Sequence, residues 1–136
     1  MSQAATKVLV VEDEIDVRTR IETILKFEGY DTVGAGSVRE GLRLSLSERP
    51  DIVVSDILME NGDGLELVSV LRSRPESRLL PIIMVTALSD RQWQRRFMAL
   101  GADDYITKPF TTEELVSAVH SQRLKIEWRK TENRSE

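Results

Sequence analysis

Hydrophobic residues occur in short runs along this chain, and a polar residue follows four of these runs. The four junctions are Val8–Val11 before Glu12 and Asp13, Ile52–Ser55 before Asp56, Ile82–Val85 before Thr86, and Tyr105–Thr107 before Lys108. Runs of about four to eight residues rich in valine and isoleucine are typical of buried strands. A weaker run, Tyr30–Ala35, predicts one more strand, so the pattern indicates five strands in total.

Apolar residues recur at helical spacing between these strands. Val17, Ile21 and Leu25 predict a first helix that stops at Gly29. Ser37–Glu40 has the form of a capping box and predicts the start of a second helix. Further helices are expected over residues 65–72, from 89 to 100 with a cap at Ser89 and Asp90, and from 111 to about 130. Strict alternation of strand and helix predicts a parallel sheet that is covered on both faces.

The strand ends carry the candidate chemistry. Ligands of such sheets bind at the carboxyl ends of the strands, where the polar residues of this chain would converge. The loop after the first strand, Glu12–Glu14, contains no glycine and would repel a bare phosphate. Carboxylates attract hard cations, and Mg²⁺ suits one or two carboxylates while it bridges to phosphate oxygens. A single acid such as Asp56 is commonly a cap or turn residue, but together with Thr86 and Lys108 it indicates a site for a divalent cation and a phosphoryl group.

Composition narrows the class of protein. A chain of 136 residues with 40% hydrophobic and 31% charged residues is ordinary for one globular domain. The net charge of -4 argues against direct nucleic-acid binding by this domain. There is no cysteine, no signal-peptide pattern and no apolar run near the ~20 residues of a membrane span, so we expect a cytoplasmic protein without membrane contact. His120 is the single histidine, and we expect it at the surface without a role in phosphotransfer.

Four segments in order complete the pattern: Val8–Glu14, Asp56–Met59 with Gly64, Thr86–Ala87, and Gly101–Phe110. Taken together they closely resemble the receiver domain of two-component response regulators, over residues 7–122. The resemblance implies an α/β fold of the flavodoxin-like type. It has a doubly wound sheet of five parallel strands in the order 2-1-3-4-5, with helices on both faces.

The resemblance assigns a metal site and a phosphoacceptor. Asp56 would attack the phosphoryl group of a phosphohistidine on a histidine kinase or phosphotransfer protein. Mg²⁺ would be bound directly by Asp13, Asp56 and the backbone carbonyl of Leu58, and by Glu12 through water. The cation would neutralise the clustered negative charge that otherwise repels the donor.

The same resemblance implies a switch. Lys108 would pair with a phosphoryl oxygen, and Thr86 would donate its hydroxyl to the phosphoryl group with help from the amide of Ala87. Tyr105 would rotate inward as Thr86 moves, so the phosphate selects between two packings of the domain. The peptide bond between Lys108 and Pro109 is expected to be cis, as it is in the family.

The output surface is expected on the fourth helix, fifth strand and fifth helix. Met98 and Tyr105 would belong to it, and its partner would be an output domain, another protein or a second copy of the chain. Trp93, Phe97 and Leu100 share one stripe of the fourth helix, and we expect that stripe to be buried in the core.

The ends of the chain and one loop depart from a minimal receiver. Residues 1–6 are expected to be disordered, and residues 123–136 extend the last helix as a tether to an effector or as a frayed tail, with a disordered end at 131–136. Leu124 and Trp128 form one apolar ridge, too little for a coiled coil.

Glu60 and Gly62 stand where the family often has proline and a hydrophobic residue, so we expect the loop after Asp56 to be more mobile.

Three function classes fit the same residues. The first is the phosphorylation-controlled switch, and the second is a magnesium-dependent phosphatase that works through an aspartyl phosphate. Phosphatases of that kind carry a second acid two residues after the nucleophile, where this chain has Leu58, so we do not expect an enzyme. The third is a phosphorylation-independent interaction module, which would have lost acids, lysine or hydroxyl.

The resemblance also places Leu58 and Leu88 at the positions whose side chains hold the water that hydrolyses the aspartyl phosphate. Neither side chain can form a hydrogen bond to that water.

Overall fold

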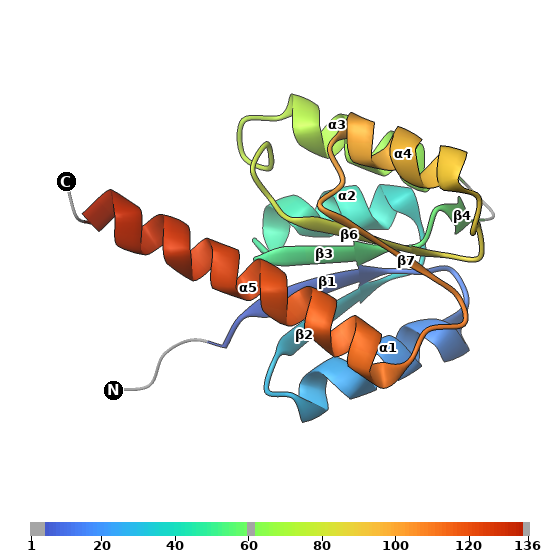
Figure 1. Ribbon diagram of the computed structural model, residues 1–136, viewed down its shortest axis with the longest axis horizontal. Helices are drawn as coiled ribbons and strands as arrows, with labels where there is room; N and C mark the ends of the chain where they lie inside the picture. Colours follow the sequence, from blue (N-terminus) through green and yellow to red (C-terminus); the bar gives the residue numbers. More distant parts are fainter. Residues whose placement is uncertain (1–4, 60–61, 135–136) are drawn as a thin grey trace.

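Five parallel strands form one sheet at the centre of the domain (Figure 1). The computed structural model describes residues 5–59 and 62–134. The strands are β1 (Lys7–Val11), β2 (Asp31–Ala35), β3 (Ile52–Ser55), β6 (Ile82–Thr86) and β7 (Asp104–Thr107). They lie in the order β2-β1-β3-β6-β7, and every neighbouring pair is parallel. This is the predicted 2-1-3-4-5 order of a flavodoxin-like sheet.

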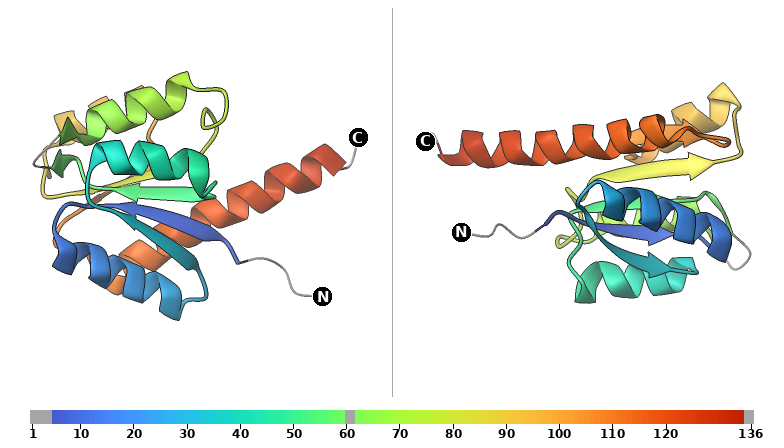
Figure 2. Two further views of the ribbon diagram at one scale, coloured as in Figure 1. Left: turned by 180° about the vertical axis from the view of Figure 1, so that it is seen from behind. Right: turned by 90° about the horizontal axis from the view of Figure 1, so that it is seen from below.

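Helices cover both faces of this sheet (Figures 1 and 2). The described residues contain α1 (Ile15–Phe27), α2 (Val38–Ser47), α3 (Gly64–Ser73), α4 (Arg91–Leu100) and α5 (Thr112–Arg134). Helices α1 and α5 pack on one face together with Val8 and Val10, whereas α2, α3 and α4 pack on the other face with Leu9 and Val11. Because alternate residues of a strand point to opposite faces, a strand buried on both sides is hydrophobic at every position.

Side-chain caps lie at the starts of α2, α4 and α5, the last formed by Thr111 and Glu114. The hydroxyl of Ser37 accepts a hydrogen bond from the Glu40 amide at 3.1 Å, and the Glu40 carboxylate accepts one from the Gly36 amide at 3.1 Å. This reciprocal pair is the predicted capping box, except that the Glu40 carboxylate accepts from the Gly36 amide rather than from the amide of Ser37 itself. Asp90, rather than Ser89, caps α4 by accepting from the Gln92 amide at 2.8 Å.

The connection from β3 to α3 contains a short antiparallel pair in place of the predicted open loop. β4 (Leu58–Met59) pairs with β5 (Gly62–Asp63). The expectation of mobility at Glu60 concerns a residue that lies outside the described residues. A Cβ on Gly64 would lie 2.7 Å from the Met84 side chain and 2.8 Å from the Asp56 carbonyl oxygen, so glycine lets this connection pass close behind Asp56.

The helix α4 buries less than its sequence pattern predicts. Phe97 is fully buried, as expected, but Trp93 and Leu100 are 37% and 36% exposed, so the prediction of a buried stripe is wrong for these two. The helix packs against the rest of the domain at Phe97. Trp93 and Leu100, one turn before and one turn after Phe97, lie beyond this contact and reach solvent. The Trp93 ring packs against Phe97 with centroids 6.3 Å apart, and the Arg96 guanidinium lies 5.4 Å from the Trp93 ring centroid. Met98 is 42% exposed, as predicted.

Arg72 fixes the far end of α4. Its guanidinium donates to the Gly101 carbonyl at 2.8 and 3.0 Å and pairs with Asp103 at 2.8 Å. Gly101 ends α4 with a φ of 117°, a conformation that favours glycine. Burial lowers the pKa of Arg72, while Asp103 opposes this shift. The end of α4 is therefore held by side-chain bonds from α3.

The last helix is longer than predicted and projects beyond the body of the domain (Figures 1 and 2). It runs to Arg134, so the prediction of disorder from residue 131 is wrong for 131–134, and residues 135 and 136 lie outside the described residues. Leu124 and Trp128 are 48% and 65% exposed, while Ile126 packs against the core. His120 is exposed, as predicted.

The amino-terminal prediction is only partly covered by the described residues. Of the predicted disordered segment 1–6, residues 1–4 lie outside the described residues, and the Thr6 carbonyl accepts from the Asp31 amide at 3.0 Å. Among the helices of the described residues, none combines the length and the hydrophobicity needed to span a membrane.

Candidate functional site

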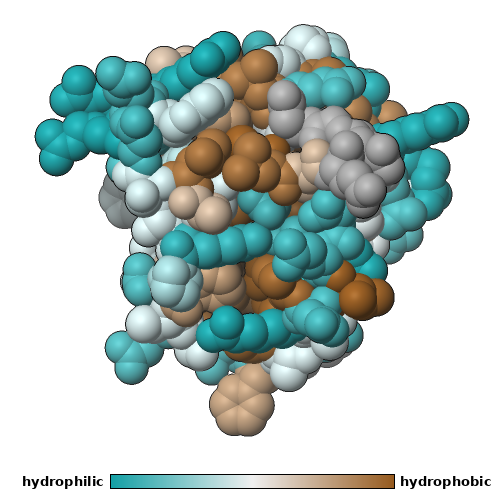
Figure 3. Space-filling model, turned by 90° about the vertical axis from the view of Figure 1, so that its right-hand side faces the viewer, coloured by the Kyte–Doolittle hydropathy of each residue, from teal (hydrophilic) through white to brown (hydrophobic). Residues whose placement is uncertain are grey.

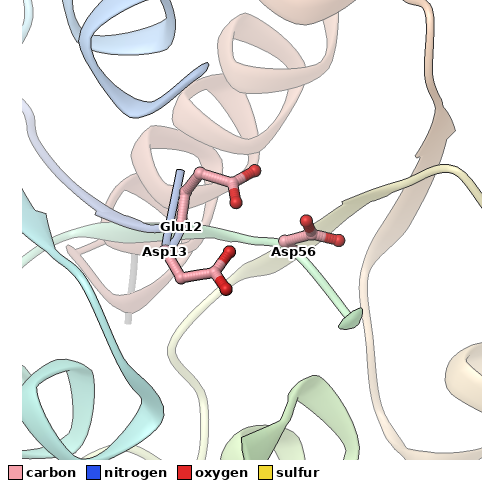
Figure 4. Close-up of side chains that lie close together, drawn as sticks. All are labelled: Glu12, Asp13 and Asp56. Atoms are coloured by element: carbon pink, nitrogen blue, oxygen red, sulfur yellow. The ribbon is translucent and has the colours of Figure 1, made fainter. Parts of the chain in front are cut away.

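Three carboxylates meet at the edge of the sheet where the strands end (Figure 4). Glu12 and Asp13 follow β1, and Asp56 follows the neighbouring strand β3. Backbone bonds continue the ladder at this edge, because the Asp56 amide donates to the Val11 carbonyl at 3.0 Å and the Glu12 amide to the Ala35 carbonyl at 2.9 Å. One oxygen from each of the three acids lies within 4.8 Å of the others. Parallel pairing therefore brings together acids that are more than forty residues apart in the chain.

Lys108 adds a positive charge to this cluster. It follows β7, and its ammonium lies 2.8 Å from Glu12 Oε1 and 2.9 Å from Asp56 Oδ2. Its own amide donates to the Thr86 carbonyl at 2.7 Å, which ties the end of β7 to the end of β6. The Lys108–Pro109 peptide bond is cis, as predicted. The acids after β1 and β3 and the lysine after β7, which the sequence placed at three separate strand ends, thus form one cluster.

The other carboxylate oxygens of the cluster accept backbone donors. The Leu58 amide donates to Asp56 Oδ1 at 3.2 Å, and the Glu14 amide donates to Glu12 Oε2 at 3.3 Å. Arg18, from α1, donates to the Glu12 carbonyl at 2.7 Å. No feature of the sequence pattern points to Arg18, because a side chain that binds a backbone carbonyl leaves no signal in residue spacing. The role of the Leu58 carbonyl as a metal ligand stays a prediction.

Burial and charge shift the pKa values of two members of the cluster. Burial raises the pKa of Glu12 to about 7, assisted by the charge of Asp56 and opposed by the hydrogen bond from Lys108. Burial lowers the pKa of Lys108, but the bonds and charges of Glu12 and Asp56 raise it more, so the net shift is upward. The raised pKa of Lys108 favours a charged pair with Glu12, whereas the raised pKa of Glu12 opposes it. The Lys108 ammonium stays charged near neutral pH, because its pKa is raised above the ordinary value of 10.5.

A divalent cation fits this donor set. Glu12 and Asp56 are 1% and 7% exposed, and Asp13 is partly exposed, so the cluster opens to solvent on one side only. All three groups offer hard oxygen donors, which suit Mg²⁺ rather than a softer metal. Three carboxylates against one ammonium leave an excess of negative charge for a cation to neutralise.

Thr86 and Tyr105 meet at the loop between β6 and α4. Thr86 is fully buried, and its hydroxyl oxygen accepts from the Leu88 amide at 3.3 Å. The Tyr105 hydroxyl donates to the carbonyl of Leu88 at 2.7 Å. Burial raises the pKa of Tyr105, and the negative charges of Asp56 and Asp90 raise it further. The sequence pointed to Thr86 and Tyr105 as site residues, but not to the contacts that the backbone of Leu88 makes with each of them. The exposed Ala87 lies between Thr86 and Leu88.

Comparison with known proteins identifies the family. The model of the response regulator receiver domain matches residues 8–120. This chain belongs to the receiver domain family. It is 41% identical over 115 residues to "Probable transcriptional regulator ycf27" of Porphyridium aerugineum, covering 85% of this chain and 47% of the relative. The relative of the same name from Cyanophora paradoxa shows the same identity and coverage. The chain therefore spans about half the length of these curated relatives.

Solved structures support the same assignment. Chemotaxis protein CheY4 of Vibrio cholerae is 30% identical, with a TM-score of 0.82 over 87% of this chain and 98% of that chain. The receiver domain of Francisella response regulator 1452 is 31% identical, with a TM-score of 0.83 over 89% of this chain and 98% of that chain. The residues matched by the family model, 8–120, lie within the predicted receiver segment 7–122, whose exact bounds stay a prediction.

The receiver domain separates its predicted residues into two groups. Glu12, Asp13, Asp56 and Lys108 form the cluster at the sheet edge, with Thr86 at the end of the adjoining strand. Met98 lies apart from them, on the exposed side of α4. Figure 3 views the molecule onto the edge toward which the strands point, and hydrophobic areas alternate there with hydrophilic ones.

Proposed function

We propose that this receiver domain is a phosphorylation-controlled signalling switch with Asp56 as the phosphoacceptor. The observation that carries the proposal is the position of the Asp56 carboxylate, which lies within the acid cluster and 2.9 Å from the Lys108 ammonium. The donor would be a phosphohistidine on a histidine kinase or phosphotransfer protein. Exposed Ile15 and Leu58, which follow site residues in the chain, offer apolar surface for such a protein.

The transfer uses groups that are already in place. An Asp56 oxygen forms the new bond to phosphorus while the bond from phosphorus to the donor imidazole nitrogen breaks, and the imidazole keeps the electron pair. The Leu58 amide and Lys108 hold the two Asp56 oxygens, which orients the carboxylate for attack. Lys108 is also placed to pair with an oxygen of the transferred group. Mg²⁺ bound by Asp13, Asp56 and the Leu58 carbonyl, with Glu12 reached through water, would supply the positive charge that lets an anionic donor approach.

The signal would pass through the loop between β6 and α4. The Thr86 hydroxyl can donate to a phosphoryl oxygen, with the Ala87 amide as a second donor, and this pull would weaken the bond between Thr86 and the Leu88 amide. Because Tyr105 binds the carbonyl of the same Leu88, a change at Thr86 acts directly on Tyr105. Rotation of Tyr105 would then alter the face made by α4, β7 and α5.

That face would bind the output partner. Met98 and Tyr105 belong to it, and the exposed Trp93 extends it, so aromatic and thioether surface is available for adaptable contacts. An output domain, another protein or a second copy of the chain would occupy it. The extension of α5 to Arg134 would serve as the tether where an output domain follows in the chain.

A second function on the same fold is a phosphorylation-independent interaction module. It is less favoured because the three strand-end acids, the hydroxyl and the lysine are all present, and the Lys108 ammonium pairs with Glu12 and Asp56. An enzyme is also less favoured, since the exposed Leu58 stands where an aspartyl-phosphate phosphatase would carry its second acid.

Intact-mass measurement with a small phosphodonor tests the proposal. With acetyl phosphate and Mg²⁺, the chain should gain a single phosphoryl group, and chelation of Mg²⁺ should prevent the gain. Asp56→Asn should abolish labelling, whereas Asp31→Asn, the same change on the exposed Asp31 at the start of β2, should label normally. Full labelling of the Asp56→Asn protein would refute the assignment.

A further inference from the structure

We propose that the groove between α2 and α3 is a docking site for an acidic amphipathic helix of a partner protein. The groove encloses about 410 Å³, within the range of ~300–1,000 Å³ that is usual for ligand sites. Figure 2 shows α2 and α3 side by side. None of the carboxylate cluster, Thr86 or Tyr105 lines the groove, so the inference goes beyond the proposed phosphotransfer function.

The floor of the groove is an apolar stripe along α2. Val38, Leu42 and Leu46 line it, and a spacing of four residues places them on one side of the helix. Val38 is only 3% exposed, so Leu42 and Leu46 form the accessible part of the stripe. At 1.5 Å per residue the stripe is about 12 Å long, or two helical turns. Leu46 is 44% exposed, so the stripe reaches solvent at its end. On the α3 side, Glu66 lines the groove from within the helix, and Arg74 lines it just past the end of the helix at Ser73.

A straight groove of this kind favours a helical occupant. Amphipathic helices dock by placing apolar side chains at every third or fourth position into such grooves. One or two leucine-type side chains on one face of a partner helix would meet Leu42 and Leu46, the accessible residues of the stripe. A small ligand would use only part of this length.

Charge then selects the chemistry of the occupant. Arg39 and Arg43 flank the stripe on α2, and Arg74 stands at the opposite wall beyond the end of α3. Three guanidinium groups face one carboxylate, that of Glu66, although the protein has a net charge of -4. The groove is therefore a basic site on an acidic protein, and carboxylates beside the apolar positions of a partner helix would pair with its arginines.

Arg74 gives a second reason to expect an anionic partner. Its Nη1 is buried, and no hydrogen-bond acceptor for it is found within residues 5–59 and 62–134. A buried guanidinium donor without an acceptor is unfavourable. Because Arg74 as a whole is only partly buried, its guanidinium can rotate to meet a carboxylate at the groove. A nucleic-acid backbone would satisfy the arginines but leave the apolar floor exposed, so the acidic helix is the better match.

Binding of a defined peptide tests this inference. The probe is a fluorescein-labelled helical peptide of repeated Glu-Leu-Leu-Glu units, and the control peptide has lysine in place of every glutamate. Fluorescence anisotropy should show saturable, salt-sensitive binding of the acidic peptide alone. Amide shifts on titration of ¹⁵N-labelled protein should cluster in α2 and α3 rather than in α4.

Substitutions of residues that line the groove test whether the peptide binds there. Arg43→Glu and Arg74→Glu should each weaken binding by about tenfold or more. Leu46→Asn should weaken it too, whereas Arg91→Glu, the same charge change on exposed α4, should leave it unchanged. Thermal melts would show that each variant is folded, and labelling at Asp56 should persist in all of them.

Three results would overturn the inference: no binding of the acidic peptide, equal binding of the lysine peptide, or shifts confined to another face. Because labelling of Asp56 is measured separately in the same proteins, failure of the groove and failure of phosphotransfer give different outcomes.

Discussion

The ammonium of Lys108 donates to Asp56 Oδ2 at 2.9 Å, across more than fifty residues of chain. Glu12 accepts from the same ammonium at 2.8 Å, so one lysine pairs with two buried carboxylates and offsets only part of their charge. The lysine and a divalent cation therefore share the task of balancing the negative charge at the sheet edge.

This sharing predicts the behaviour of Lys108→Ala. The variant should bind Mg²⁺ with equal or higher affinity, because the carboxylates lose a competing positive charge. Without metal it should be destabilised, since two buried carboxylates are left unpaired, and Mg²⁺ should restore part of the loss. Phosphorylation should no longer alter the α4 face. Isothermal titration with Mg²⁺, with Lys125→Ala on exposed α5 as the control, checks the affinity, and loss of Mg²⁺ binding would contradict the role given to Lys108.

The raised pKa of Glu12 predicts a pH dependence of the metal-free protein. Its pKa rises from 4.5 to about 7 on folding, so the folded state binds the proton more tightly than the unfolded state. The stabilisation from this group is complete below pH 4.5 and is lost as the pH rises through about 7. Over that window the wild type should lose on the order of 1–3 kcal/mol of stability relative to Glu12→Gln.

Urea unfolding of both proteins in chelator, at pH steps between the two pKa values, measures this difference. Mg²⁺ affinity of the wild type should rise over the same window, because the metal binds the deprotonated carboxylate. Parallel stability curves for wild type and Glu12→Gln would show that Glu12 does not titrate there.

The exposure of Trp93 predicts a contrast between two aromatic truncations. Phe97→Ala should destabilise by about 3–5 kcal/mol, because Phe97 is fully buried. Trp93→Ala should cost only about 1 kcal/mol, since the ring is 37% exposed, but it should weaken binding at the α4 face. Equilibrium unfolding followed by circular dichroism avoids the signal of Trp128. A loss for Trp93→Ala as large as that for Phe97→Ala would place the ring in the core after all.

Leu58 and Leu88 predict a long-lived aspartyl phosphate. Leu58 lies next to the site, since its backbone amide donates a hydrogen bond to the Asp56 carboxylate. Leu88 contacts Thr86 and Tyr105 through its backbone. Neither side chain can hold a hydrolytic water by a hydrogen bond, so hydrolysis should be slow.

The test is a time course of phosphate release with Mg²⁺. Leu58→Asn with Leu88→Glu should shorten the lifetime clearly, whereas Leu79→Asn, at a 67% exposed position between α3 and β6, should not. Decay within seconds in the wild type, or an unchanged lifetime in the double variant, would be incompatible with this explanation.

Much of this domain follows from sequence alone. A strand that is buried on both faces is hydrophobic at nearly every position, so β1, β3 and β6 and the polar residues at their ends are visible as runs and boundaries, whereas the edge strands β2 and β7 leave weaker runs. Parallel order then requires that Glu12, Asp13, Asp56, Thr86 and Lys108 share one edge, and the family pattern supplies their roles. These features are local in the chain or follow from the topology that local pattern dictates.

The tertiary structure determined burial, contacts and pKa values, which a periodic sequence pattern does not encode. Trp93 and Phe97 have the same helical phase, yet only Phe97 lies over the sheet, because burial depends on where a helix crosses its neighbours. The bond from Arg18 to the Glu12 carbonyl, the two contacts of Leu88 and the raised pKa of Glu12 each depend on groups brought together only by folding. Sequence therefore determined which chemical groups reach the site, whereas three-dimensional packing set their distances, their protonation and the surfaces left open to partners.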